Sequence, residues 1–162
     1  MIRVLSSGVV WCIGILAIVT VAAAAEPEGW GTDFEQAKKA ATEKKLPILM
    51  DFSGSDWCIW CQRLDAEVFS QKAFIDYAKD NLILFLVDFP MRAQQADALR
   101  AQNRQLQSTY RVAGYPTVVL VNAQGEELAR SDYRKGGAEA YVEHLKELVA
   151  GKKPVEPAAA GH

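Results

Sequence analysis

Two short apolar runs constrain the fold of this chain most. Residues 47–52 and 82–87 are almost wholly apolar, and residues typical of turns follow each run. Continuous rather than alternating apolarity is typical of strands that are buried on both faces of a sheet. Between the two runs, apolar residues recur every three or four positions, which indicates helices. The sequence therefore favours an α/β domain in which helices cover a central sheet.

A capping-box pattern marks where the folded domain begins. Thr32 can cap a helix and Glu35 can reach back to it, so a first helix is predicted from residue 32 to about residue 45. Three further elements complete a domain over residues 32–150: a polar helix over 93–110, a hairpin of strands 117–121 and 127–130, and a last helix over 138–150. The predicted order is α-β-α-β-α-β-β-α, and the closing hairpin makes the sheet mixed.

The first 25 residues have the pattern of a secretory signal peptide. Arg3 supplies a positive charge, the run 9–21 is uncharged, and residues 22–25 are small alanines suited to cleavage. The alternative is an uncleaved membrane anchor, but this run is shorter than the about 20 residues that a helix needs to span a membrane. Residues 26–31 would form a polar lead-in, and residues 151–162 a disordered tail. We therefore expect a secreted or periplasmic protein.

The charge balance excludes one class of function. The chain has 162 residues, of which 50% are hydrophobic and 23% charged, and its formal net charge is −2 at pH 7. This length and balance suit one globular domain. No basic stretch interleaved with aromatic residues occurs, so nucleic acid is not an expected partner.

Two cysteines follow the first apolar run, at the start of a predicted helix. Cleavage of the signal peptide would remove Cys12 and leave Cys58 and Cys61, which lie three positions apart and close enough to exchange a disulfide. A static disulfide is one alternative, but such a short bridge constrains little of the unfolded chain. A metal site is another, yet structural zinc usually needs four Cys or His ligands, and only His144 and His162 could join the cysteines.

Three segments together resemble the thioredoxin-like superfamily. They are a strand ending in Asp51-Phe52, the motif Trp57-Cys58-Ile59-Trp60-Cys61 opening a helix, and Gly114-Tyr115-Pro116-Thr117 before a strand. The resemblance covers residues 32–150 and extends to secreted bacterial thioredoxin-like proteins that carry a Ser-Gly-Ser-Asp-Trp-Cys segment. It implies a thioredoxin fold, with a central mixed β-sheet flanked by helices, and a thiol–disulfide oxidoreductase that needs no cofactor.

Four residues are candidates for the chemistry. Cys58 would be the nucleophile, because a helix N-terminus favours its thiolate, and Cys61 would resolve the mixed disulfide. The resemblance implies that Pro116 follows a cis peptide bond, faces the cysteines and helps to align the substrate; the alternative is an ordinary proline at a strand start. Asp51 could accept the proton of Cys61 if burial raises its pKa. Asp51 lies one residue further from the first cysteine than in ordinary thioredoxins, and the alternative is a polar strand-end residue bonded to the backbone.

Three aromatic residues near the cysteines are candidates for substrate binding, namely Trp57, Trp60 and Tyr115. Trp60 occupies a position that is usually exposed, which favours contact with unfolded or extended substrate. For Trp57, core packing is the favoured role. Asp56 is expected to face solvent or to cap a turn, and His144 to lie on the flank of a surface helix.

The predicted function is reduction of protein disulfides, which leaves the enzyme oxidised. Its partners would be protein thiols and disulfides, and a thiol donor outside the cytoplasm, either membrane-borne or another thioredoxin-like protein. Oxidation or isomerisation of substrate thiols is the opposite direction of the same chemistry. A non-catalytic binding or chaperone module is a different class of function, against which the two intact cysteines argue.

Overall fold

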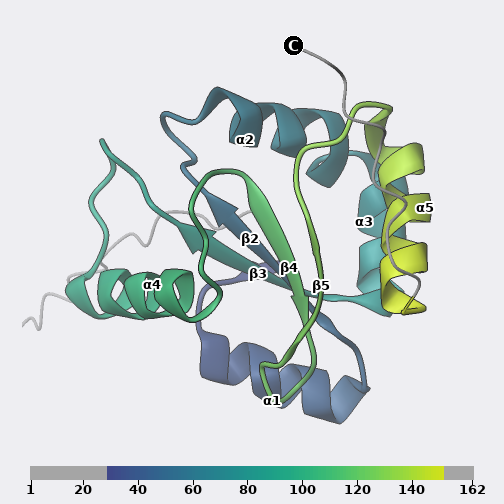
Figure 1. Cartoon of the computed structure of the whole chain (residues 1–162), viewed down its shortest axis with the longest axis horizontal. Helices are drawn as coiled ribbons and strands as arrows, with labels where there is room; N and C mark the ends of the chain where they lie inside the picture. The colour runs from purple at the N-terminus through teal and green to yellow at the C-terminus, as the bar shows by residue number, and fades with distance from the viewer. Residues whose placement is uncertain (1–28, 152–162) are drawn as a thin grey trace, which may run out of the picture.

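The structure is a computed structural model that describes residues 29–151. It consists of a mixed β-sheet with helices on both faces (Figure 1). The predicted signal peptide and all but the first residue of the predicted tail lie outside the described residues. The strands are β1 (Trp30–Gly31), β2 (Ile48–Ser53), β3 (Ile83–Asp88), β4 (Thr117–Val121) and β5 (Glu127–Ser131). The helices are α1 (Phe34–Lys44), α2 (Ile59–Leu64), the π-helical turn η1 (Asp65–Phe69), α3 (Lys72–Asn81), α4 (Asp97–Thr109) and α5 (Gly137–Val149). Within residues 29–151, no helix is both long and apolar enough to cross a membrane.

The order of the strands confirms the predicted mixed sheet. The strands lie in the order β1-β3-β2-β4-β5, with β2 parallel to β3 and antiparallel to β4. The strand β5 closes the predicted hairpin with β4. The predicted order of elements omitted β1, because two residues within a polar segment carry no strand pattern. In the structure Trp30 is buried and pairs with Leu84 of β3, so this edge strand is held by its side chain as well as by its backbone.

Two apolar clusters, one on each face of the sheet, form the core. The strand β2 contributes to both, because successive side chains of a strand point to opposite faces. Leu49 belongs to the cluster under α3 and α5, whereas Ile48 and Met50 belong to the cluster under α1 and α4 (Figure 1). This burial on both faces explains the unbroken apolar run. Asp51, two residues after Leu49, lies on the face covered by α3 and α5.

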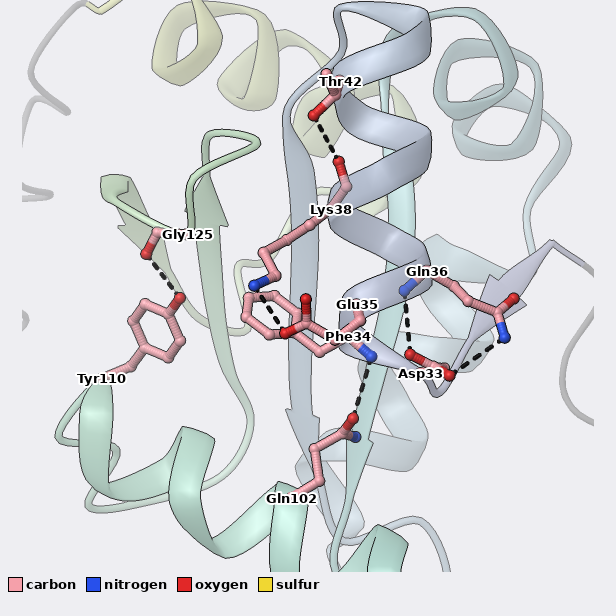
Figure 2. Close-up of polar contacts among 9 residues, drawn as sticks. All are labelled: Asp33, Phe34, Glu35, Gln36, Lys38, Thr42, Gln102, Tyr110 and Gly125. Carbon is pink, nitrogen blue, oxygen red and sulfur yellow. Dashed lines mark hydrogen bonds and ion pairs between the residues drawn. The ribbon is translucent and has the colours of Figure 1, made fainter.

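The first helix begins one residue later than the capping-box pattern predicted. Asp33, not Thr32, is the N-cap, and its carboxylate accepts the backbone N–H of Gln36 at 3.0 Å (Figure 2). Glu35 forms an ion pair with Lys38 at 2.7 Å. Both threonine and aspartate cap helices well, and the cap is the residue whose backbone is still extended. Asp33 has that conformation, with φ −99° and ψ 111°.

Hydrogen bonds join α4 and the residue after it to the start of α1 and to the turn between β4 and β5 (Figure 2). The backbone N–H of Phe34, at the start of α1, donates to the side-chain oxygen of Gln102 at 3.1 Å. The Gln102 amide also donates to the carbonyl of Thr32 at 2.8 Å. After the end of α4, the Tyr110 hydroxyl donates to the carbonyl of Gly125 in the β4–β5 turn at 2.8 Å. The middle of α4 and the residue after its end are thereby held in place.

The prediction that His144 lies on a surface flank is wrong. His144 is buried in α5, and its Nε2 atom is 2.9 Å from the hydroxyl of Ser131 in β5. It lies three residues after the buried Tyr141 and shares that helix face, with the two rings 6.0 Å apart. Burial lowers the pKa of His144 because it disfavours the charged imidazolium.

Candidate active site

Cys58 and Cys61 form a disulfide at the start of α2, where the motif predicted a redox pair. Cys58 is the N-cap of α2, and its sulfur accepts the backbone N–H of Cys61 at 3.2 Å. Both side chains are largely buried, Cys58 at 6% exposure and Cys61 at 4%. Unpaired backbone N–H groups at a helix start favour negative charge. The same arrangement would stabilise a thiolate on Cys58 after the bridge is reduced.

Asp56, in the turn that precedes the disulfide, holds a neighbouring loop in place. Its carboxylate accepts the backbone N–H groups of Met91, Arg92 and Ala93 at 2.9, 2.6 and 3.0 Å. These hydrogen bonds, first that of Met91, lower the pKa of Asp56 because they stabilise the ionised form. The helix α4 begins at Asp97, four residues later than predicted.

A second carboxylate fastens the same turn. Asp88, the last residue of β3, accepts the backbone N–H of Ser55 at 2.9 Å and its hydroxyl at 2.6 Å. From the other side, the amide of Gln62 in α2 donates to the Ser55 carbonyl at 3.1 Å. The residues before Cys58 are therefore tied to β3, to the loop after β3 and to α2, which gives the disulfide a rigid support.

Trp57 lies at the surface, so the prediction of core packing is wrong. Its side chain is 39% exposed, and its indole N–H donates to the carbonyl of Phe89 at 2.8 Å. The Trp57 ring meets the Tyr115 ring edge to face at 5.7 Å, and Tyr115 also contacts the Phe89 ring at 5.3 Å. The polar end of the indole finds its partner in a loop, which keeps the ring out of the core.

Replacing Gly54 by alanine is expected to displace Trp57. A Cβ atom at residue 54 would lie closer than 3.0 Å to three atoms of the indole ring, so the ring would have to leave the Phe89 carbonyl. We expect a changed tryptophan fluorescence spectrum and a loss of about 1–3 kcal/mol in the free energy of unfolding, as overpacking usually costs. Fluorescence spectra and guanidinium unfolding measure both effects.

The control for this prediction is Gly114→Ala, because a Cβ atom there would meet nothing within 4 Å. We expect this variant to keep both the spectrum and the stability of the parent protein. An unchanged spectrum in Gly54→Ala would contradict the packing of Trp57 over the glycine.

Tyr115 and Pro116 are joined by a cis peptide bond, as the resemblance implied. Pro116 comes directly before β4, where its missing N–H leaves no bond of the ladder unmade. The side-chain amide of Gln107 in α4 donates to the Tyr115 hydroxyl at 2.7 Å. Burial, and secondarily the nearby Asp88, raises the pKa of Tyr115, so this hydroxyl stays protonated at neutral pH. The docked helix α4 thus positions the residue that precedes the proline.

A groove of about 370 Å³ lies beside the disulfide, and Trp60 forms one of its walls at 47% exposure. The groove is lined by Trp60, Tyr115, Pro116, Asp132, Tyr133 and Lys135. The structure therefore brings together three of the predicted site residues in one depression, while Trp57 contacts Tyr115. Sequence reasoning missed Tyr133, whose signal was a single aromatic residue in an otherwise polar loop.

Asp51 is buried in β2, between Leu86 of β3 and Val118 of β4 in the register of the sheet. Its Oδ1 atom has no hydrogen-bond partner among the described residues. Burial, and then the carboxylates of Asp65 and Asp88, raise its pKa to about 8. The carboxyl group is therefore largely protonated at neutral pH.

Comparison with known proteins identifies the family. A family model described as a thioredoxin-like domain matches residues 34–145. The chain belongs to the thioredoxin-like domain family. A solved structure named DsbH oxidoreductase has a TM-score of 0.72 and 30% identity, and the match covers 80% of this chain and 93% of that one. The disulfide bond reductase DsbH of Chlamydia pneumoniae is 34% identical over 113 residues, which are 70% of this chain and 68% of the relative.

Two further matches extend this picture. The thiol:disulfide interchange protein DsbD of Vibrio vulnificus is 26% identical over 163 residues, and this chain spans only 25% of its length. A thioredoxin from Thermus thermophilus shares the fold, with a TM-score of 0.56 at 18% identity. With its Cys58–Cys61 disulfide, this thioredoxin-like domain carries the redox pair of a thiol–disulfide oxidoreductase. Within residues 29–151, no three His, Cys, Asp or Glu side chains are grouped as a metal site would require.

Proposed function

We propose that this thioredoxin-like domain reduces protein disulfides outside the cytoplasm, with Cys58 as nucleophile and Cys61 as resolving cysteine. The observation that carries the proposal is the disulfide at the start of α2, beside a groove formed by Trp60 and Pro116. The direction is supported by the similarity to DsbH of Chlamydia pneumoniae, which is named a disulfide bond reductase.

The reaction starts from the reduced enzyme. The Cys58 thiolate attacks one sulfur of the substrate disulfide, and the other substrate sulfur leaves as a thiolate. Cys61 then loses its proton and attacks the Cys58 sulfur, which releases the second substrate sulfur. The substrate has gained two electrons and takes up two protons, while the enzyme has formed the Cys58–Cys61 bond described in the structure.

Asp51 would take part in the second step as a proton acceptor. Its pKa of about 8 lies near that of a free thiol, about 8.5, so a proton could pass between the two groups with little free-energy cost. Only the minor ionised fraction of Asp51 could act as the base at neutral pH. Pro116 and Tyr115 would align the substrate backbone beside Cys58, while Trp57 and Trp60 would contact its apolar side chains.

The location rests on the N-terminal pattern. Arg3, the uncharged run 9–21 and the alanines before residue 26 favour export with cleavage, and an uncleaved anchor is the alternative. A reductase in that location needs a thiol donor to reduce its disulfide again. We propose a membrane-borne donor or another thioredoxin-like protein. Mass spectrometry of the exported protein tests the location, because a retained residue 1 would favour the anchor.

The equilibrium reduction potential of the Cys58–Cys61 pair tests the direction of electron flow. We expect a value nearer to the about −270 mV of thioredoxin than to the about −120 mV of a strong disulfide oxidant. Equilibration against glutathione buffers, read by thiol alkylation and mass spectrometry, measures it. A value near that of the oxidant would replace the reductase with an oxidase or isomerase. A pair that does not exchange with glutathione would favour a non-catalytic module.

A further inference from the structure

Four side chains from α2, η1 and the loop after β5 form a closed cluster beside the groove. The Tyr133 ring lies 5.2 Å from the Trp60 ring, and the Tyr133 hydroxyl donates to the Glu67 carboxylate at 2.6 Å. The Arg63 guanidinium lies 5.0 Å from the Trp60 ring and 5.3 Å from the Tyr133 ring, and it binds Glu67 at 2.9 Å. Each member therefore touches at least two of the others.

The cluster joins the loop after β5 to the helix that carries the disulfide. Hydrogen bonds from Tyr133, and then from Arg63, lower the pKa of Glu67, so its carboxylate is ionised and both bonds are charge-assisted. Glu67 lies in the π-helical turn η1, four residues after Arg63. Short π-helical turns inside helices are frequent at functional sites. Here the turn carries the carboxylate that holds the Tyr133 hydroxyl.

Trp60 connects the groove to the disulfide, because it lines the groove and lies between the two cysteines in the chain. When a substrate sulfur reaches Cys58, the residues next to that sulfur in the substrate would lie over the first turn of α2. Trp60 is exposed on this turn. The groove has a volume of about 370 Å³. Pockets for small ligands typically have volumes of about 300–1,000 Å³, so this groove suits one large side chain. Three aromatic rings and a proline supply most of its lining, and only Asp132 and Lys135 carry charge.

We propose that this groove binds an aromatic side chain next to the disulfide cysteine of a protein substrate, with Tyr133 as the residue that sets this preference. Trp60 and Tyr133 would pack against the incoming ring, and Pro116 would form the opposite wall. Glu67 is a positioning residue, since it acts through the Tyr133 hydroxyl. This inference rests on the proposed disulfide-reducing function and adds a substrate class to it.

Two matched peptides test the preference. Each contains one disulfide, and they differ only in whether phenylalanine or serine flanks the cysteines. We expect the parent protein to reduce the phenylalanine peptide with about tenfold higher kcat/KM, as an aromatic contact of about 1.4 kcal/mol would give, mostly through KM. Tyr133→Ala should lose most of this preference, so that its kcat/KM values for the phenylalanine and serine peptides become nearly equal. Tyr133→Phe, which keeps the ring but not the bond to Glu67, should retain part of it.

Trp60→Ala removes the aromatic ring that α2 contributes to the groove, and it should also lower the ratio of the two kcat/KM values. Leu128→Ala removes an exposed apolar side chain of β5 outside the groove and should keep the full preference. Circular dichroism and thermal unfolding confirm that each variant is folded. Equal rates for the two peptides in the parent protein, or a full preference in both groove variants, would overturn the inference.

These outcomes separate the inference from the function on which it rests. If glutathione disulfide and both peptides are reduced at equal efficiency, the reductase stands and the aromatic preference is wrong. If the parent protein reduces none of the three, the proposed function fails and the inference fails with it.

Discussion

Replacing Cys58 by serine is expected to reduce disulfide-reducing activity about a thousandfold or more, which is typical of the loss of a catalytic nucleophile. A serine hydroxyl is not ionised at neutral pH and does not form a mixed disulfide. The variant should still fold, because the lost disulfide joins residues only three positions apart and constrains little of the unfolded chain. Reduction of insulin, followed by its turbidity in the presence of dithiothreitol, measures the activity.

Cys61→Ser is the matched comparison, because it leaves the nucleophile in place and removes the resolving thiol. We expect this variant to accumulate a mixed disulfide between Cys58 and the substrate, detectable as a mass adduct that dithiothreitol removes. If the adduct formed on Cys58→Ser instead, the two roles would have to be exchanged. Full activity in Cys58→Ser would remove the catalytic assignment altogether.

Replacing Asp51 by asparagine is expected to change how stability depends on pH. The folded-state pKa of Asp51 is about 8, while an unfolded aspartate has a pKa near 3.9. Between these values the folded state binds one more proton than the unfolded state, so stability falls as pH rises through this window. The slope for this one group is on the order of 1 kcal/mol per pH unit. Guanidinium unfolding of the oxidised protein at pH 5, 6.5 and 8 should show this loss in the parent protein and much less of it in Asp51→Asn.

Asp56→Asn is the control for this pH dependence. Hydrogen bonds lower the pKa of Asp56, so its contribution is lost only as pH falls below the usual range of a carboxyl group. The decline in stability between pH 5 and pH 8 should therefore persist in this variant. A pH dependence between pH 5 and pH 8 that is the same in Asp51→Asn as in the parent protein would contradict the raised pKa of Asp51.

The same Asp51 variant tests the proposed proton transfer. An asparagine cannot accept the proton of Cys61, and loss of a general base typically slows a step about a hundredfold or more. Stopped-flow reduction of a mixed disulfide on Cys58 isolates the resolving step from the first attack. An unchanged rate of that step at neutral pH would show that another group or water accepts the proton, while the stability result would stand separately.

Patterns of neighbouring residues predicted the buried strands and the start of the helix that carries the cysteines. The two apolar runs became β2 and β3, because a strand buried on both faces needs no polar residue in alternation. The predicted helix start at the first cysteine is correct as well, with Cys58 as the N-cap of α2. The capping box failed by one residue, because Thr32 and Asp33 are both good caps and the sequence pattern alone does not distinguish them.

The candidate site was less predictable, since its contacts join segments far apart in the chain. Trp57 was expected in the core, but its indole N–H found the carbonyl of Phe89, which lies 32 positions away. Tyr133 lies in a polar loop and was not predicted as a site residue, yet its hydroxyl donates a hydrogen bond to Glu67, which lies 66 positions away. His144 was placed at the surface, because neither its packing against Tyr141 nor its contact with Ser131 of β5 is visible in a helical pattern.

The alternation of helices and buried strands, and the position of two thiols at a helix start, could be inferred from the amino-acid sequence, because periodicity, turn residues and spacing are properties of neighbouring residues. The surroundings of those thiols depend on tertiary packing. Packing places Tyr133 beside Trp60, brings the backbone N–H groups of residues 91–93 to Asp56, and buries Asp51 with an unbonded Oδ1 atom. These features arise when strands and loops pack together, since burial and long-range hydrogen bonds depend on which segments the sheet brings into contact.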